Sequence, residues 1–161
     1  ETVLISHKLG FKNNSKKTSS LYSELLNLME AGKADFTGTF KSLKATLIKE
    51  DDTIFLNNFR NSDEGKQHAV SQWLGNWRKL LQENSKSKTE AIELLSSSNP
   101  EFIMRNHLVE QAIGKATKGD FSDFEILCDL LITPFEVKEN HETFYKAPTD
   151  SEVVHQTFCG T

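Results

Sequence analysis

The stretch from residue 99 to residue 134 constrains the fold more than any other part of the chain, because its helix signals are nearly complete. It reads NPEFIMRNHLVEQAIGKATKGDFSDFEILCDLLITP. Asn99 suits an N-cap, and Pro100 suits the first helical position, where its missing N–H costs no hydrogen bond. Gly119 is typical of the left-handed residue that closes a helix. The pattern therefore predicts a helix from Asn99 to about Lys118.

A second helix is predicted directly after the first. Ser122 and Glu125 have the spacing of a capping box, and Phe121 is placed to pack against Ile126 as a hydrophobic staple. Pro134 ends this second helix. Together the two helices predict a tight helical hairpin.

Arg105 is the unusual residue of the first predicted helix. At about 100° per residue it projects from the middle of an apolar face, and Asn106 lies at the edge of that face. The other members of the face are Phe102, Met104, Leu108, Val109, Ala112, Ile113 and Ala116. A guanidinium among apolar side chains must have its charge paired. We therefore expect Arg105 and Asn106 to form a structural or interface clamp, with the guanidinium bonded to a carboxylate or to carbonyl groups. The alternative is that the Arg105 stem lies on the apolar surface and its head stays in water.

Composition narrows the class of protein. The chain has 161 residues, 37% of them hydrophobic and 26% charged, which suits one globular domain with a real core. The net charge is −4, and no basic stripe is interleaved with aromatic residues, so we expect no nucleic-acid partner. No stretch approaches the roughly 18 apolar residues of a membrane span, and no signal peptide is visible. The chain begins with Glu1, so we expect a fragment of a longer protein.

The two cysteines are too few for a disulfide framework. Cys128 lies among Phe124, Leu127 and Leu131 on an almost entirely apolar helix, which predicts a buried, inert thiol. The five histidines have no metal-ligand spacing with each other or with the cysteines. No metal site is predicted in this segment.

The rest of the chain also has helical periodicity. Trp73 and Trp77 lie on one arc with neighbouring leucines; a ligand-stacking role is the alternative, but this spacing favours core positions. Residues 51–61 fit either a helical turn or a short strand, and we favour helix. The chain is predicted to begin with the end of a helix over residues 1–11, closed by Gly10, and a polar linker over residues 12–20. Further helices are predicted over about 20–31, 34–50 (capped by Asp35), 62–84 and from Ser87 to about 95. A loop is predicted over residues 96–98.

The fold class that follows is all-α, a bundle of about six or seven helices with an extended C-terminal tail. We predict three parts: a helix end and polar linker over residues 1–18, a helical domain over 19–133, and a tail over 134–161 that packs on it. Phosphate-binding, nucleophile-elbow and kinase motifs are all absent from the sequence. Asp120 and Asp123 are better explained as cap and first-turn residues than as an acid–base pair. No catalytic, cofactor-binding or metal-binding residue is therefore predicted here.

The 99–134 stretch resembles the C-terminal signature of the selenoprotein O family, whose bacterial members include YdiU. Further segments resemble the family in the same order along the chain. The matching positions are Asn99-Pro100, Phe102, Ile103, Arg105-Asn106, Leu108, Ala112-Ile113, Ala116 and Gly119-Asp120-Phe121-Ser122, then Lys8-Leu9-Gly10-Phe11, Asp35-Phe36-Thr37 with Phe40 and Leu43, Trp73-Leu74 with Trp77-Arg78 and Leu80, Lys146-Ala147-Pro148 and Cys159-Gly160-Thr161.

This resemblance implies a parent protein with a kinase-like fold that transfers AMP from ATP to protein hydroxyl groups, with magnesium as cofactor. The ATP and metal residues would lie upstream of Glu1, in a kinase-like domain that would be the partner of this segment; the parent would act on protein substrates in the bacterial cytoplasm. Some members end in a cysteine–selenocysteine motif. By this resemblance Cys159 is the redox candidate of this chain. It has no selenocysteine or second cysteine beside it, so it would act alone or with a cysteine in another part of the parent protein.

We therefore expect the C-terminal helical domain of a protein adenylyltransferase. By itself it would be non-catalytic, buttress the kinase-like core and carry a possible regulatory thiol. The alternative is a stand-alone α-helical module for protein interactions. Whether the natural reading frame continues upstream of Glu1 with ATP and metal motifs decides between the two.

Overall fold

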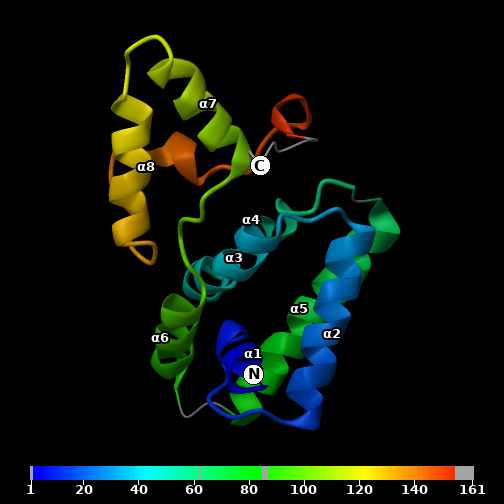
Figure 1. Cartoon of the computed structure of the whole chain (residues 1–161). Coiled ribbons are helices and arrows are strands. Elements are labelled where there is room, and N and C mark those ends of the chain that lie inside the picture. Colours follow the sequence, from blue (N-terminus) through cyan, green and yellow to red (C-terminus); the bar gives the residue numbers. More distant parts are fainter. Residues whose placement is uncertain (1, 62, 85–86, 155–161) are drawn as a thin grey trace. The chain divides into compact units, whose positions relative to one another are not determined.

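The computed structural model describes residues 2–61, 63–84 and 87–154, which form eight α-helices and two short 3-10 helices without a β-strand (Figure 1). The all-α prediction is confirmed, with eight α-helices in place of six or seven. The chain divides into two compact units, unit 1 over residues 1–99 and unit 2 over residues 100–161. No boundary is predicted at this position from the sequence, and the boundaries predicted after residues 18 and 133 stay predictions.

Unit 1 contains six of the helices. Side-chain caps fix the starts of three of them, because the oxygens of Ser15, Asp35 and Ser87 accept from the backbone N–H three residues further on. The predicted linker is shorter than expected, since the Ser15 cap starts its helix at Lys16. The helices are α1 (Thr2–Lys8), α2 (Lys16–Ala31), α3 (Phe36–Lys49), α4 (Thr53–Leu56), α5 (Glu64–Asn84) and α6 (Lys88–Ser98).

The core of unit 1 is built around α5, which lies alongside α2 (Figure 1). Trp73 and Trp77 are both buried, so the prediction that they are core residues is confirmed. Their indole N–H groups donate to the carbonyl oxygens of Leu21 and Leu9, each at 2.9 Å. These bonds satisfy the only polar atom of each ring, and they fasten α5 to the chain before and within α2.

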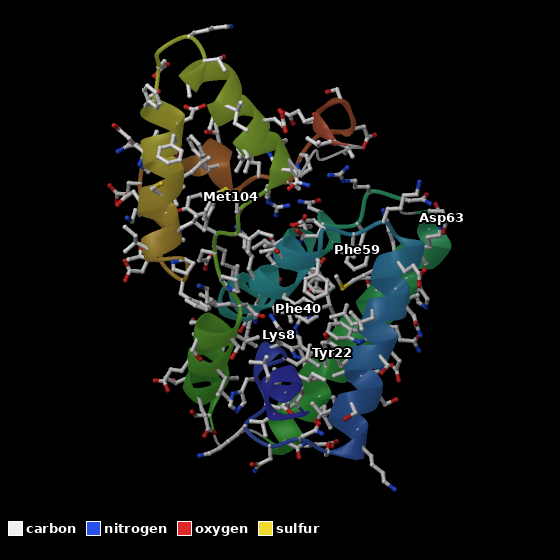
Figure 2. All side chains as sticks on the ribbon, viewed as in Figure 1. Lys8, Tyr22, Phe40, Phe59, Asp63 and Met104 are labelled. Carbon is white, nitrogen blue, oxygen red and sulfur yellow. The ribbon has the colours of Figure 1, made fainter. Side chains whose placement is uncertain are left out.

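The end of α1 is fastened to the end of α6. Gly10 has a φ of +80°, the left-handed conformation predicted for it. Lys8 Nζ lies 3.2 Å from the carbonyl oxygen of Ser98 and 5.4 Å from the ring centre of Phe40 (Figure 2). Asn99 Nδ2 donates to the Lys8 carbonyl at 3.0 Å. The prediction that Asn99 caps a following helix is therefore wrong, because its side chain binds α1 instead.

Unit 2 is a hairpin of α7 (Asn106–Ala116) and α8 (Ser122–Ile132), followed by η1 (Glu142–Tyr145) and η2 (Asp150–Glu152). The first helix of the hairpin thus begins at Asn106, six residues later than the predicted first helical residue, Pro100. The preceding residues are not helical, because the N–H of buried Phe102 donates to the carbonyl of Pro134 at 3.0 Å. This bond closes the base of the hairpin across more than thirty residues of chain.

The other helix ends agree with the sequence-based predictions at some positions and differ at others. Ser122 is the first residue of α8 rather than its cap, and its N–H donates to Asp120 Oδ1 at 3.0 Å. Gly119 has the predicted left-handed conformation, with φ of +88°, and α8 ends shortly before Pro134 as predicted. Residues 96–98 continue α6 instead of forming a loop. The two 3-10 helices give the tail more local structure than the extended form predicted for it.

Candidate functional site

Arg105 and Asn106, the predicted clamp residues, lie at the start of α7. Arg105 is half-buried in the N-cap position, and Asn106 is the exposed first residue of the helix. Because the helix starts here, neither residue lies on the apolar helical face predicted for it. The clamp itself stays a prediction.

Unit 2 contains a cavity of about 460 Å³ beside α7. Helix α7 and the first turn of α8 supply one side of the cavity, and the tail around η1 and η2 supplies the other. Its polar lining residues are His107, Gln111, Lys115, Asp123, Thr143, Lys146, Thr149 and Glu152.

Asp123 is the central charged group of this cavity. It is only 5% exposed, and it accepts from Lys115 Nζ at 2.7 Å and from Gln111 Nε2 at 2.9 Å. The hydrogen bond from Lys115 to this carboxylate raises the pKa of Lys115. Position 123 was predicted as a first-turn residue, which is correct, but its partners on α7 were missed. The four-residue spacing of Gln111 and Lys115, which places both on one helical face, is the signal that could have found them.

The tail closes the cavity with a second set of polar contacts. Glu152 accepts from the N–H and the hydroxyl of Thr149, at 2.8 and 2.7 Å, and these bonds lower the pKa of Glu152. Burial lowers the pKa of His107, and the charge of Glu152 opposes that shift. The carboxylates of Asp123 and Glu152 thus already have donors within the cavity. This arrangement suits a structural junction of tail and hairpin better than general acid–base chemistry.

Unit 1 has a larger cavity, of about 720 Å³, with apolar walls and charged rims. The guanidinium of Arg78 forms a double hydrogen bond with the carboxylate of Asp52. Lys88 Nζ lies 3.0 Å from Glu50 Oε1. The apolar wall residues are Leu47, Leu81 and Ala91. Because the opposite charges are paired across the rim, the cavity shows no surplus charge for an ionic ligand.

Among the residues that the structure describes, neither a metal-ligand cluster nor a phosphate-binding glycine loop is present. Within the described ranges, no group of three or more His, Cys, Asp or Glu side chains is close enough to hold a metal ion. Of the glycines in the described ranges, Gly10 and Gly119 have a positive φ, and both close helices instead of forming a phosphate-binding loop. None of the helices that the structure describes is both long and apolar enough to span a bilayer.

One of the two thiols differs from expectation. Cys128 is exposed, so the prediction that it is buried is wrong. Helix α8 is apolar on nearly every side, and it buries Leu127 and Leu130 while Phe124, Cys128 and Leu131 lie on the exposed side. Cys159, the redox candidate, lies outside the described residues.

Comparison with known proteins assigns the family. A family model described as "Protein adenylyltransferase SelO" matches residues 2–132. The protein nucleotidyltransferase YdiU of Rhizobium meliloti (strain 1021) is 40% identical over 156 residues, which cover 96% of this chain and 31% of that protein. The YdiU protein of Bacillus cereus is 34% identical over 155 residues, covering 96% of this chain and 30% of that protein. This chain thus spans about a third of the length of these relatives. It belongs to the SelO protein adenylyltransferase family, as the sequence resemblance predicts.

Proposed function

We propose that this chain is the C-terminal helical part of a bacterial, cytoplasmic protein adenylyltransferase that transfers AMP from ATP to protein hydroxyl groups. The observation that carries the proposal is the family match over residues 2–132, in a chain that spans 31% of a relative named a protein nucleotidyltransferase. On this proposal the ATP and magnesium sites belong to the kinase-like domain upstream. The segment is non-catalytic by itself and buttresses that domain.

The paired charges of the two cavities support a structural role. Asp123 is held by Lys115 and Gln111, and Asp52 is held by Arg78. Carboxylates that hold the magnesium ion of a bound nucleotide must instead be free to coordinate that ion. Removing them from their partners would cost the stability that these pairs provide.

Calorimetry with ATP and magnesium tests the proposal on two proteins, the 161-residue chain and the full-length parent. We expect binding and AMP transfer to a protein substrate with the parent and neither with the 161-residue chain. Micromolar ATP binding by residues 1–161 alone would overturn the proposal. A reading frame that starts at this segment would favour the stand-alone interaction module.

Cys159 is proposed as a regulatory thiol of the parent protein. The resemblance to family members whose redox-active residues lie at their C-terminal ends supports this role. We expect the AMP-transfer activity of the parent to differ between oxidising and reducing conditions, and we expect Cys159→Ser to abolish the difference. The matched control is Cys128→Ser, and loss of the redox response in this control variant alone would refute the role of Cys159.

A further inference from the structure

Helix α8 has a second apolar face that its own unit leaves exposed. The helix buries Asp123, Leu127 and Leu130 within unit 2. The neighbouring side of the helix carries what we call the α8 stripe, which consists of Phe121, Phe124, Cys128, Leu131 and Phe135. The four hydrophobic members other than Cys128 are between 43% and 56% exposed, and Cys128 is exposed as well. Exposed large apolar side chains grouped on one helix mark an interaction surface.

The spacing of the α8 stripe indicates what kind of element it fits. Its members follow one another at intervals of three, four, three and four residues, from the N-cap of α8 to the turn just after it. This is the alternation of the a and d positions of a heptad, with which one helix packs its side chains between those of another. Phe124, Cys128 and Leu131 lie within the 11 residues of α8, so the stripe fits a helix over about one and a half heptads.

Charge narrows the choice of partner. Of the three carboxylates of helix α8, Asp123 is buried and bound to Lys115, so Glu125 and Asp129 are the exposed ones, and the helix has no Lys or Arg. The basic side chain of Lys138 is already bound to Asp129, with Nζ 2.6 Å from Oδ2. Two copies of α8 would bring acidic helices together, which is unfavourable, whereas a helix with Lys or Arg beside its apolar ridge would be complementary.

We propose that the α8 stripe is the docking surface for a basic-flanked amphipathic helix in the part of the parent protein that lies outside this chain. This inference rests on the proposed function and names the surface through which the segment would buttress the catalytic domain. Two observations support this occupant. The sequence covered here is 31% of a relative's length, so most of the relative lies outside it. All members of the stripe except Phe135 lie inside the region that matches the family model, residues 2–132.

Cys128 provides a native reporter at the centre of the stripe. Both the 161-residue chain and the full-length parent, each in a Cys159→Ser background, are treated with a thiol reagent, and the adduct on Cys128 is followed by mass spectrometry. We expect labelling in the parent to be at least roughly tenfold slower than in the 161-residue chain, because covering a thiol blocks the reagent. Equal rates in the two proteins would overturn the proposal.

Two variants of the parent sharpen the test. Phe124→Glu places a charge on the stripe and should restore fast labelling of Cys128. Ile113→Glu is the matched control, since Ile113 is 52% exposed on α7 and does not belong to the stripe, and it should leave the labelling slow. Far-ultraviolet circular dichroism checks that both variants keep their helix content. Equal acceleration by both variants would contradict docking at the stripe.

The remaining outcomes also decide the matter. Slow labelling of the 161-residue chain at every concentration would mean that its own residues cover the stripe, and the proposal fails. Labelling that slows as the concentration of the 161-residue chain rises, together with a dimer in sedimentation, would assign the stripe to a second copy instead. Failure of the proposed function is distinguishable, because it appears as ATP binding by the 161-residue chain whatever the labelling rates.

Discussion

The two units use their large apolar side chains in opposite ways. Among the described residues, seventeen apolar side chains form the buried core of unit 1, and only four large hydrophobic side chains of that unit are exposed. Unit 2 buries five and exposes ten. Burial stabilises by about 25 cal/mol per Å² of apolar surface removed from water, so unit 1 has most of the hydrophobic stabilisation. The difference indicates that unit 1 has a sufficient core of its own, whereas unit 2 depends more on what it packs against.

Separating the units is the strongest way to test this comparison. We expect residues 1–99 alone to unfold cooperatively in urea. Residues 100–161 alone should show no cooperative transition, because a chain of about 60 residues with so small a core is at the limit of stability. Circular dichroism against urea concentration checks both fragments. Cooperative unfolding of residues 100–161 would show that the five buried side chains suffice.

The next largest effect is expected from a single core residue of unit 1. Trp77 is fully buried and donates to the Leu9 carbonyl. Trp77→Ala removes this packing and leaves that carbonyl without its donor, so it should lower the free energy of unfolding by about 3–5 kcal/mol. Phe124→Ala, on the exposed side of α8, should change it by less than about 0.5 kcal/mol in the 161-residue chain. If urea titrations showed that the two variants lose similar amounts of unfolding free energy, the difference in burial between the two units would not be reflected in their stability.

The sequence predicted the helices of unit 1 well because their signals are local. Asp35 caps α3 three residues from its partner, and Trp73 and Trp77 share a face at helical spacing. Asn99 was misjudged because its partner, Lys8, is 91 residues away. A favourable cap residue says nothing about a distant carbonyl that competes for the same side chain.

In unit 2 the sequence predicted the helical hairpin but not which face of α8 is buried. Helix α8 is apolar on nearly every side, so its periodicity could not indicate which side faces the core. Cys128 was therefore placed on the wrong face. Asp123 is correctly predicted as a first-turn residue, but its pairing with Lys115 is missed, because that pairing depends on how α7 and α8 pack. The error at Cys128 and the omission at Asp123 both arise where packing, rather than local sequence, decides.

Two glycines allow a matched test with smaller effects. Gly75 in α5 and Gly114 in α7 are exposed, and an added Cβ would meet no atom within 4 Å at either position. Each Gly→Ala substitution should stabilise its own unit by about 0.5–1 kcal/mol, because alanine loses less backbone entropy on folding.

Gly38→Ala is the control for the glycine test. Its Cβ would lie 2.7 Å from Asp35 Oδ1, the atom that caps α3, so this variant should be destabilised. In urea titrations of the 161-residue chain, the gain from the double variant Gly75→Ala/Gly114→Ala should equal the sum of the single gains, because the two sites lie in different units and share no partner. A loss at Gly75 or Gly114 would mean that the exposed face of that helix is covered in solution.

The smallest effect is expected from His107, whose ring is only half-buried and so remains partly solvated. Burial lowers its pKa below the usual 6.5. The unfolded chain therefore takes up a proton more readily than the folded one as the pH falls through 6.5, and the free energy of unfolding of unit 2 should decrease there. Urea titrations at pH 7.5 and 5.5 should show this decrease, and His107→Gln should make it smaller. His68→Gln, at an exposed histidine of α5, is the control in unit 1. If His68→Gln alone reduced the pH dependence, the acid sensitivity would belong to unit 1, and the view that unit 2 is the weaker part of the chain would lose this support.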